Sequence, residues 1–147
     1  MPFKDDQGNI RWLLHLASSP EEVFHLLSTD AGRAQFWAES AKEMDSFVNF
    51  QFPNGISWCG EILENNPPGR FVIVYFGGTI TTFALSDDEK GGTDLVLTDK
   101  GVPPEDQHEV LAGWVSVLIA LKATVDFGVD LRNHYPSRTW DQGYADN

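Results

Sequence analysis

The feature that most constrains this chain is a series of short alternating segments followed by one long apolar helix. Between Glu43 and Gly101, apolar and polar residues alternate in several segments separated by turn residues. A period of two is typical of strands with one buried face. After Pro103-Pro104, apolar residues recur at helical spacing from Glu105 to about Phe127. At 1.5 Å per residue this helix is about 35 Å long, so we expect it to cross the whole sheet.

The alternation and the turns predict the individual strands. The predicted strands cover residues 9–17, 48–52, 57–62, 71–76, 79–85 and 93–98. Pro53-Asn54-Gly55, Pro67-Pro68-Gly69 and the polar segment 87–92 turn the chain between them. Residues 71–76 are apolar at every position, which favours a central strand over one that a subunit partner shields.

Two short helices are expected between the first strand and the rest of the sheet. Ser18-Ser19 provides a serine N-cap, Pro20 fits the first helical position, and Glu21 and Glu22 favour the positive end of the helix dipole. A second helical turn is predicted over residues 30–37. The order of elements predicts an α+β helix-grip fold, in which a curved antiparallel sheet with two short helices and a long C-terminal helix encloses a cavity. We assign residues 1–129 to this domain and residues 130–147 to a C-terminal extension.

Composition narrows the partners and the compartment. The 22 acidic residues against 10 Lys and Arg give a net charge of -12, which would repel nucleic acids and anionic membrane surfaces. The single cysteine cannot form an internal disulfide. We see neither a signal peptide nor a segment approaching the roughly 20 apolar residues of a membrane span. A cytoplasmic protein is therefore expected.

Several short motifs, in order, resemble one known family. They are Ser19-Pro20-Glu21-Glu22-Val23-Phe24, Gln35-Phe36-Trp37, Gly60-Glu61-Ile62-Leu63-Glu64 with Pro67-Pro68-Gly69-Arg70-Phe71, Gly92-Thr93-Asp94-Leu95, and Gly113-Trp114 with Leu118 and Leu121. This pattern resembles the START-like or Bet v 1-like superfamily (SRPBCC), and within it the bacterial heat-shock-protein-90 ATPase activator homologues. The resemblance covers residues 9–127 and implies the helix-grip fold. It also implies a possible link to a chaperone or to stress responses, although a shared fold does not establish a shared function.

Motifs for catalysis or metal binding are sparse. His15, His25, His108 and His134 lie on different predicted elements and lack the spacing of a metal site. We therefore expect no metal and no other cofactor. Cys59 is interpreted as an inert strand cysteine. The weak candidates for a general acid or base are Glu61 and Asp99, which we place near the rim of the predicted cavity.

Aromatic and apolar residues from several elements are expected to point between the sheet and the long helix. These candidate cavity residues are Trp37, Phe50, Trp58, Phe71, Ile73, Tyr75, Thr81, Phe83, Leu97, Trp114, Leu118 and Leu121. An apolar pocket with a few polar groups is the usual form of a small-molecule site, and plain core packing is the alternative. Tyr75, Thr81 and Trp114 would supply the polar contacts.

Three classes of function follow, in order of preference. The first is binding of a small hydrophobic molecule, either lipid-like or aromatic. The second is a chaperone-associated interaction protein, and the third is a cyclase- or hydrolase-type enzyme that uses the same cavity. A homodimer is also possible. In the extension, Tyr135, Trp140 and Tyr144 favour docking onto the domain or a partner over disorder.

Overall fold

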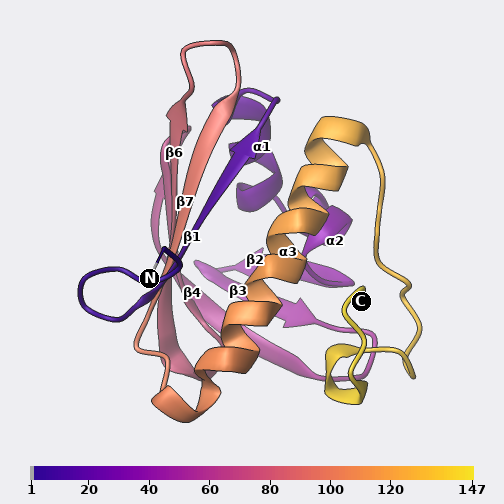
Figure 1. Cartoon of the computed structure of the whole chain (residues 1–147). Coiled ribbons are helices and arrows are strands. Elements are labelled where there is room, and N and C mark those ends of the chain that lie inside the picture. Colours follow the sequence, from indigo (N-terminus) through magenta and orange to yellow (C-terminus); the bar gives the residue numbers. More distant parts are fainter. Residues whose placement is uncertain (1) are drawn as a thin grey trace.

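Seven antiparallel strands form one curved sheet that wraps around a long helix (Figure 1). A computed structural model describes residues 2–147. The elements in chain order are β1 (Ile10–Leu16), α1 (Pro20–Ser28), α2 (Asp30–Phe36), β2 (Ser40–Met44), β3 (Phe47–Gln51), β4 (Ser57–Asn66), β5 (Arg70–Tyr75), η1 (Phe76–Gly78), β6 (Thr79–Asp87), β7 (Thr93–Lys100), η2 (Pro104–Asp106), α3 (Gln107–Phe127) and η3 (Trp140–Gln142). The predicted α+β helix-grip architecture is confirmed.

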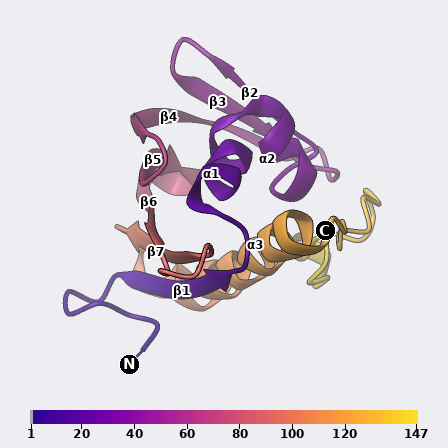
Figure 2. The same cartoon turned by 90° about the horizontal axis from the view of Figure 1, so that it is seen from above.

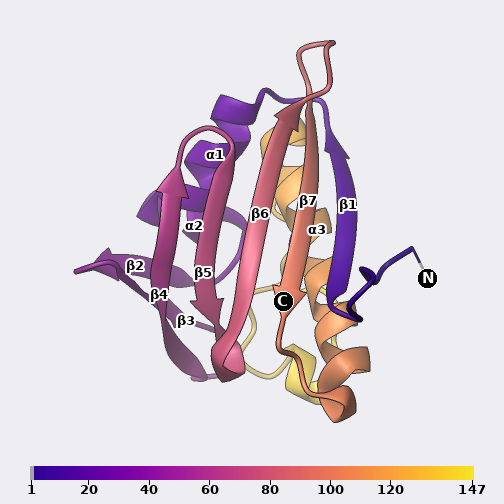
Figure 3. The ribbon, with the colours of Figure 1, turned by 90° about the vertical axis from the view of Figure 1, so that its left-hand side faces the viewer.

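The strands follow the order β1-β7-β6-β5-β4-β3-β2, so the first strand lies at one edge and the second at the other. Figure 3 shows the outer face of the sheet, with β2 and β3 crossing the direction of the other strands. Seen from above, the sheet curls around α1, α2 and α3, which all lie on its concave side (Figure 2). The core therefore forms between this concave face and the helices.

The N-terminal elements form where the sequence predicts them. The two end residues of β1, Ile10 and Leu16, are fully buried, while the side chains of Trp12 and Leu14 pack against the core. Ser19 caps α1 by accepting a hydrogen bond from the Glu22 amide at 3.3 Å. Thr29 caps α2 in the same way. Each cap pairs an amide that the first helical turn leaves free.

The edge strand β2 was not predicted. Its sequence, Ser-Ala-Lys-Glu-Met, carries a single buried side chain, Ala41, so it has no apolar alternation to detect. Arg33, which is fully buried, holds this strand in place. Its guanidinium donates to the carbonyls of Ala41 and Leu27 and to the carboxylate of Asp30. One side chain thus joins α1, α2 and β2.

The all-apolar segment forms β5, which is the middle strand of the seven. Phe71 and Ile73 point into the core and are fully buried. Val72 points to the outer face, where it lies in register between Glu64 and Thr82 and is also buried. The prediction of a central strand is confirmed.

The helix α3 corrects the expectation that no segment of the chain approaches the apolar length of a membrane span. The segment Pro104–Phe127 does have the length and composition of a possible membrane span, because an 18-residue window within it has a mean hydropathy of 1.7. In the structure this helix crosses the concave face of the sheet, and Trp114, Leu118 and Leu121 point into the core. Its outer side keeps exposed apolar residues such as Val115 and Ile119. The expectation failed because α3 is apolar on more than its buried face.

The curl of the sheet depends on Gly60. In β4, residues 57–61 pair with β3 and residues 62–66 pair with β5, with a bulge between Ile62 and Glu64. A Cβ atom at Gly60 would lie only 1.9 Å from the carbonyl oxygen of Val74. Only glycine at position 60 allows β4 to approach the Val74 carbonyl of β5 this closely.

We therefore expect Gly60→Ala to lower the free energy of unfolding by about 2–3 kcal/mol, because backbone must move. Urea denaturation measures this change. Gly113→Ala is the control, because Gly113 lies on α3 and a Cβ atom there would meet open space. That substitution should stabilise the protein by up to about 1 kcal/mol through helix propensity. Equal effects of the two substitutions would contradict the role of Gly60.

Candidate functional site

Trp37 lies at the centre of an aromatic cluster between the sheet and α3. Its ring lies 4.9 Å from Phe50, 5.5 Å from Tyr75, 5.4 Å from Phe83 and 6.0 Å from Trp114, measured between ring centroids. These rings come from β3, β5, β6 and α3, while Trp37 itself is the C-cap of α2. We call these five residues the aromatic cluster.

The candidate cavity residues predicted from sequence lie together on the inner side of the fold. Ten of the twelve are buried, namely Trp37, Phe50, Phe71, Ile73, Thr81, Phe83, Leu97, Trp114, Leu118 and Leu121. Trp58 and Tyr75 are half-buried at the end of the sheet where β4 begins and β5 ends. The rings of the aromatic cluster pack against one another in the place where the sequence predicts an enclosed cavity. That cavity therefore stays a prediction.

A polar network crosses this apolar interior. The carboxylate of Asp99, only 1% exposed, accepts hydrogen bonds from Trp114 Nε1 at 2.8 Å and from Thr81 Oγ1 at 3.0 Å. Burial raises the pKa of Asp99, although these hydrogen bonds oppose the shift. Nearby, Trp37 Nε1 donates to the Tyr75 hydroxyl at 2.9 Å. Burial, with a smaller effect of the Asp99 charge, raises the pKa of Tyr75.

Within residues 2–147, Asp99 has no positively charged partner: the ion pairs involve other acids. Next to the cluster, the buried Trp58 Nε1 has no hydrogen-bond partner in this described part of the chain, and its ring packs on Tyr75 at 5.3 Å between ring centroids. The buried hydroxyl of Thr79 lies close enough to Asp99 to lower the pKa of that carboxyl, but it makes no hydrogen bond of good geometry. Polar groups with unused hydrogen-bonding capacity thus gather at one end of the interior.

A cleft of about 300 Å³ opens next to this cluster. Its walls are the outer side of α3, the end of α2 and the C-terminal tail, residues 128–147; the lining residues include Trp37, Ala112, Val115, Ile119, Leu131, Arg132 and Asp146. Of the aromatic cluster, only Trp37 lines the cleft. Its ring also packs against Trp114, the donor to Asp99, so Trp37 contacts both the cleft and the buried polar network. A second depression, between α1 and the end of α3, touches no residue of the cluster.

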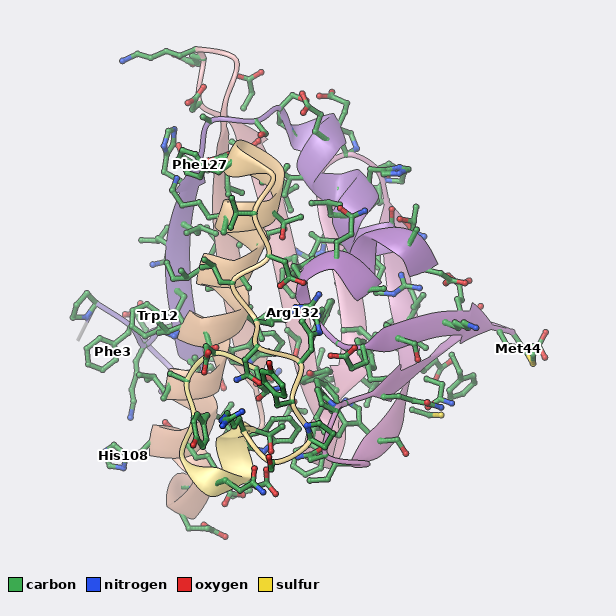
Figure 4. All side chains as sticks on the ribbon, turned by 90° about the vertical axis from the view of Figure 1, so that its right-hand side faces the viewer. Phe3, Trp12, Met44, His108, Phe127 and Arg132 are labelled. Atoms are coloured by element: carbon green, nitrogen blue, oxygen red, sulfur yellow. The ribbon has the colours of Figure 1, made fainter. Side chains whose placement is uncertain are left out.

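The C-terminal tail packs back onto the domain and forms one wall of the cleft. Arg132 donates to the carbonyls of Ala34 and Ala38 and pairs with Asp130. Figure 4 shows Arg132 where the tail passes between α3 and α2. Farther along, the Trp140 ring lies 5.0 Å from Phe52 and 6.4 Å from Trp58. Three aromatics in the tail were the only sequence signal for this docking.

Other candidates from the sequence lie away from the cluster. Glu61 is exposed and pairs with Phe47 on β3, so strand alternation places it opposite the core. Its expected position near the cavity rim is wrong for that reason, and Asp99 alone lies inside. Cys59 is exposed as well. In the described residues, His, Cys, Asp and Glu form no group able to hold a metal ion.

Comparisons with known proteins give one family. Residues 17–126 match the family model described as "Activator of Hsp90 ATPase homolog 1-like protein". No curated protein matches the chain significantly. The solution structure of the Aha1 dimer from Colwellia psychrerythraea is similar, with a TM-score of 0.73 and 22% identity over 82% of this chain and 97% of that one.

Two other solved structures are similar in fold. Protein CV1439 from Chromobacterium violaceum has a TM-score of 0.64 and 26% identity over 80% of this chain and 97% of its own. DynU16, described as a protein of the dynemicin biosynthetic locus, has a TM-score of 0.71 and 19% identity. That match covers 92% of this chain and 50% of DynU16.

The docking of the tail is expected to depend on pH through His134. This side chain contacts Glu39 and Asp130, the latter at 2.6 Å, with Arg132 nearby. Partial burial lowers the pKa of His134, but the two carboxylates outweigh it and the net shift is upward. Because the pKa of His134 is raised in the folded state, protonated His134 stabilises the docked tail fully at pH values below the ordinary histidine pKa of about 6.5. This stabilisation is lost as the pH rises through the higher folded value.

Hydrogen exchange of the Asn133 amide, which bonds to the Asp146 carbonyl, measures this docking. Protection corrected for intrinsic exchange should be greater at pH 6 than at pH 8, on the order of a few-fold. His134→Gln should remove the pH dependence. His108→Gln, at the exposed start of α3, should keep it. A pH dependence unchanged in His134→Gln would contradict this role.

Proposed function

Because this chain belongs to the family of Activator of Hsp90 ATPase homolog 1-like proteins, we propose that it binds a small hydrophobic molecule in the cleft beside α3 and in the adjoining aromatic cluster between α3 and the curved sheet. The observation that carries the proposal is the buried polar network inside an aromatic cluster, next to a cleft of about 300 Å³. Small-molecule sites typically combine apolar walls with a few polar groups, at volumes of roughly 300–1,000 Å³.

The composition of the interior supports a site over a simple core. A carboxylate in an apolar environment costs free energy, and replacing such a group by a well-packed apolar residue often stabilises a protein. Asp99 with Thr81 and Trp114 forms such a costly group. Trp58 Nε1 adds a buried donor without a partner. A ligand that pairs with some of these atoms would offset the cost.

The path for such a ligand leads from the cleft past Trp37. This side chain lines the cleft and also packs against Trp114, which donates to Asp99, so a change of its rotamer would open space between the cleft and the polar network. Side-chain rearrangement at a binding site is common. Among the structural neighbours, the description of DynU16 places that protein in a biosynthetic locus, which fits a fold that handles small molecules.

Native mass spectrometry of the protein purified from its own host tests the proposal. We expect a reproducible small adduct that is released on denaturation. Ala112→Trp should abolish the adduct, because Ala112 is an exposed residue of the cleft wall and a bulky side chain there fills the cleft. Ala31→Trp, at an exposed position of α2 outside the cleft, should leave it unchanged. An adduct that survives Ala112→Trp would place the ligand elsewhere, and bare wild-type protein would count against binding.

A second candidate function is an interaction with a chaperone, as the family description suggests. The structure offers one feature in its favour. The β2–β3 hairpin projects from the domain with Met44 at its tip (Figure 4). Met44 and Phe47 are 76% and 48% exposed. Contiguous exposed apolar side chains are typical of contact surfaces, and Met44 and Phe47 are paired residues of this hairpin.

This second function predicts that the protein changes the ATPase rate of purified Hsp90. The double substitution Met44→Ser and Phe47→Ser should then reduce the effect at least about tenfold, as expected for anchor residues of an interface. Leu63→Ser, another exposed apolar residue of the sheet, is the control. An ATPase rate that the wild-type protein leaves unchanged would rule out this activity for that partner.

A further inference from the structure

The charge around the aromatic cluster narrows the class of ligand. The Asp99 side chain is buried, and its carboxyl group accepts two hydrogen bonds. It forms no ion pair with Lys, Arg or His among residues 2–147. Burial raises the pKa of Asp99, while its two donors, Trp114 Nε1 and Thr81 Oγ1, oppose that shift by favouring the ionised form. A positive charge beside this carboxyl group would offset its loss of water and stabilise the ionised form further.

The aromatic rings next to Asp99 also favour a positively charged ligand. Trp114 donates to Asp99, and its ring lies 5.0 Å from Tyr75 and 6.0 Å from Trp37. The faces of aromatic rings carry negative potential and attract cations, most strongly when the site is shielded from water. Cages of several aromatic rings are a usual site for a quaternary ammonium group, and here the rings lie beside a carboxyl group.

The cleft that leads to the cluster has compatible charges. Its charged lining residues are Arg132 and Asp146. The guanidinium of Arg132 is already engaged with Asp130 and with two carbonyls of α2 and its C-terminal end, so its charge is balanced. Asp146 has no ion pair in the described residues. With a net charge of -12, the whole molecule also attracts cations toward this opening.

We propose that the ligand is an organic cation, with an amine or quaternary ammonium group on an apolar or aromatic body. The positive group lies among Trp37, Tyr75 and Trp114 next to Asp99, and the apolar body extends into the cleft beside Val115 and Ile119. The inference rests on the proposed function and goes beyond it by assigning the charge of the ligand. It also assigns Asp99 as the residue that selects this charge.

Three probes of similar size test the proposal: benzyltrimethylammonium, its neutral isostere neopentylbenzene, and the anion phenylacetate. Binding is measured by calorimetry at neutral pH. The wild-type protein should bind the cation at least about tenfold more tightly than the anion, as expected for a charge-assisted contact. Asp99→Asn should weaken binding of the cation by about tenfold or more and leave the neutral probe within about twofold.

The matched control is Asp94→Asn, on the same strand but on the exposed outer face of the sheet. It removes the same charge from the molecule, so it separates a local effect of Asp99 from the overall field. This variant should keep the wild-type preference for the cation. Thermal unfolding shows whether Asp99→Asn is folded, and if it is not, the comparison of cation and anion in the wild-type protein decides.

The outcomes separate the two proposals. Equal binding of phenylacetate and benzyltrimethylammonium, or unchanged binding of the cation by folded Asp99→Asn, would overturn the inference about charge. Binding of neopentylbenzene alone would also overturn it, while supporting a hydrophobic site. If none of the probes binds and native mass spectrometry finds bare protein, the proposed function itself is overturned.

Discussion

The ring of Trp37 joins the sheet to the long helix α3, and the packing of the interior depends on these contacts. Its ring touches rings from β3, β5, β6 and α3, and its indole N–H donates to Tyr75. A curved sheet can close on a helix only if something fills the space at the bend, and here one side chain from the end of α2 fills it. The same side chain lines the cleft and packs against Trp114, the donor to the buried Asp99. One position therefore contributes both to the packing of the interior and to the wall of the cleft.

The sequence predicts those strands correctly in which apolar and polar residues alternate clearly. Strands with one buried face, such as β7 with Leu95 and Leu97, alternate clearly and were predicted. The same alternation gave the inner face for the eight candidate cavity residues on strands, and helical spacing gave it for Trp114, Leu118 and Leu121. The strand β2 was missed because its position depends on Arg33 and on pairing with β3, neither of which leaves a local pattern. Long-range hydrogen bonds of this kind are invisible to periodicity.

The candidate site was predictable in part for the same reason. Strand alternation gives the face on which a residue lies, so Asp99 could be placed near the interior, and Glu61 could have been excluded by the alternation of β4. The central role of Trp37 follows from the C-cap of α2 and could not be read from a strand pattern. The cleft also needs the tail, whose docking depends on contacts such as Arg132 with the Ala34 and Ala38 carbonyls. Such contacts are defined only once the domain has folded.

The tail gives this chain a feature outside the part that its family model matches, residues 17–126. It is held by polar contacts, including those of Arg132 and His134, more than by burial of large apolar side chains. Polar contacts at the surface are weaker and more sensitive to conditions than core packing. A wall held in this way can open at a lower free-energy cost than the sheet or α3. The fold thus combines a densely packed aromatic interior with a separately tethered segment that forms one wall of the adjacent cleft.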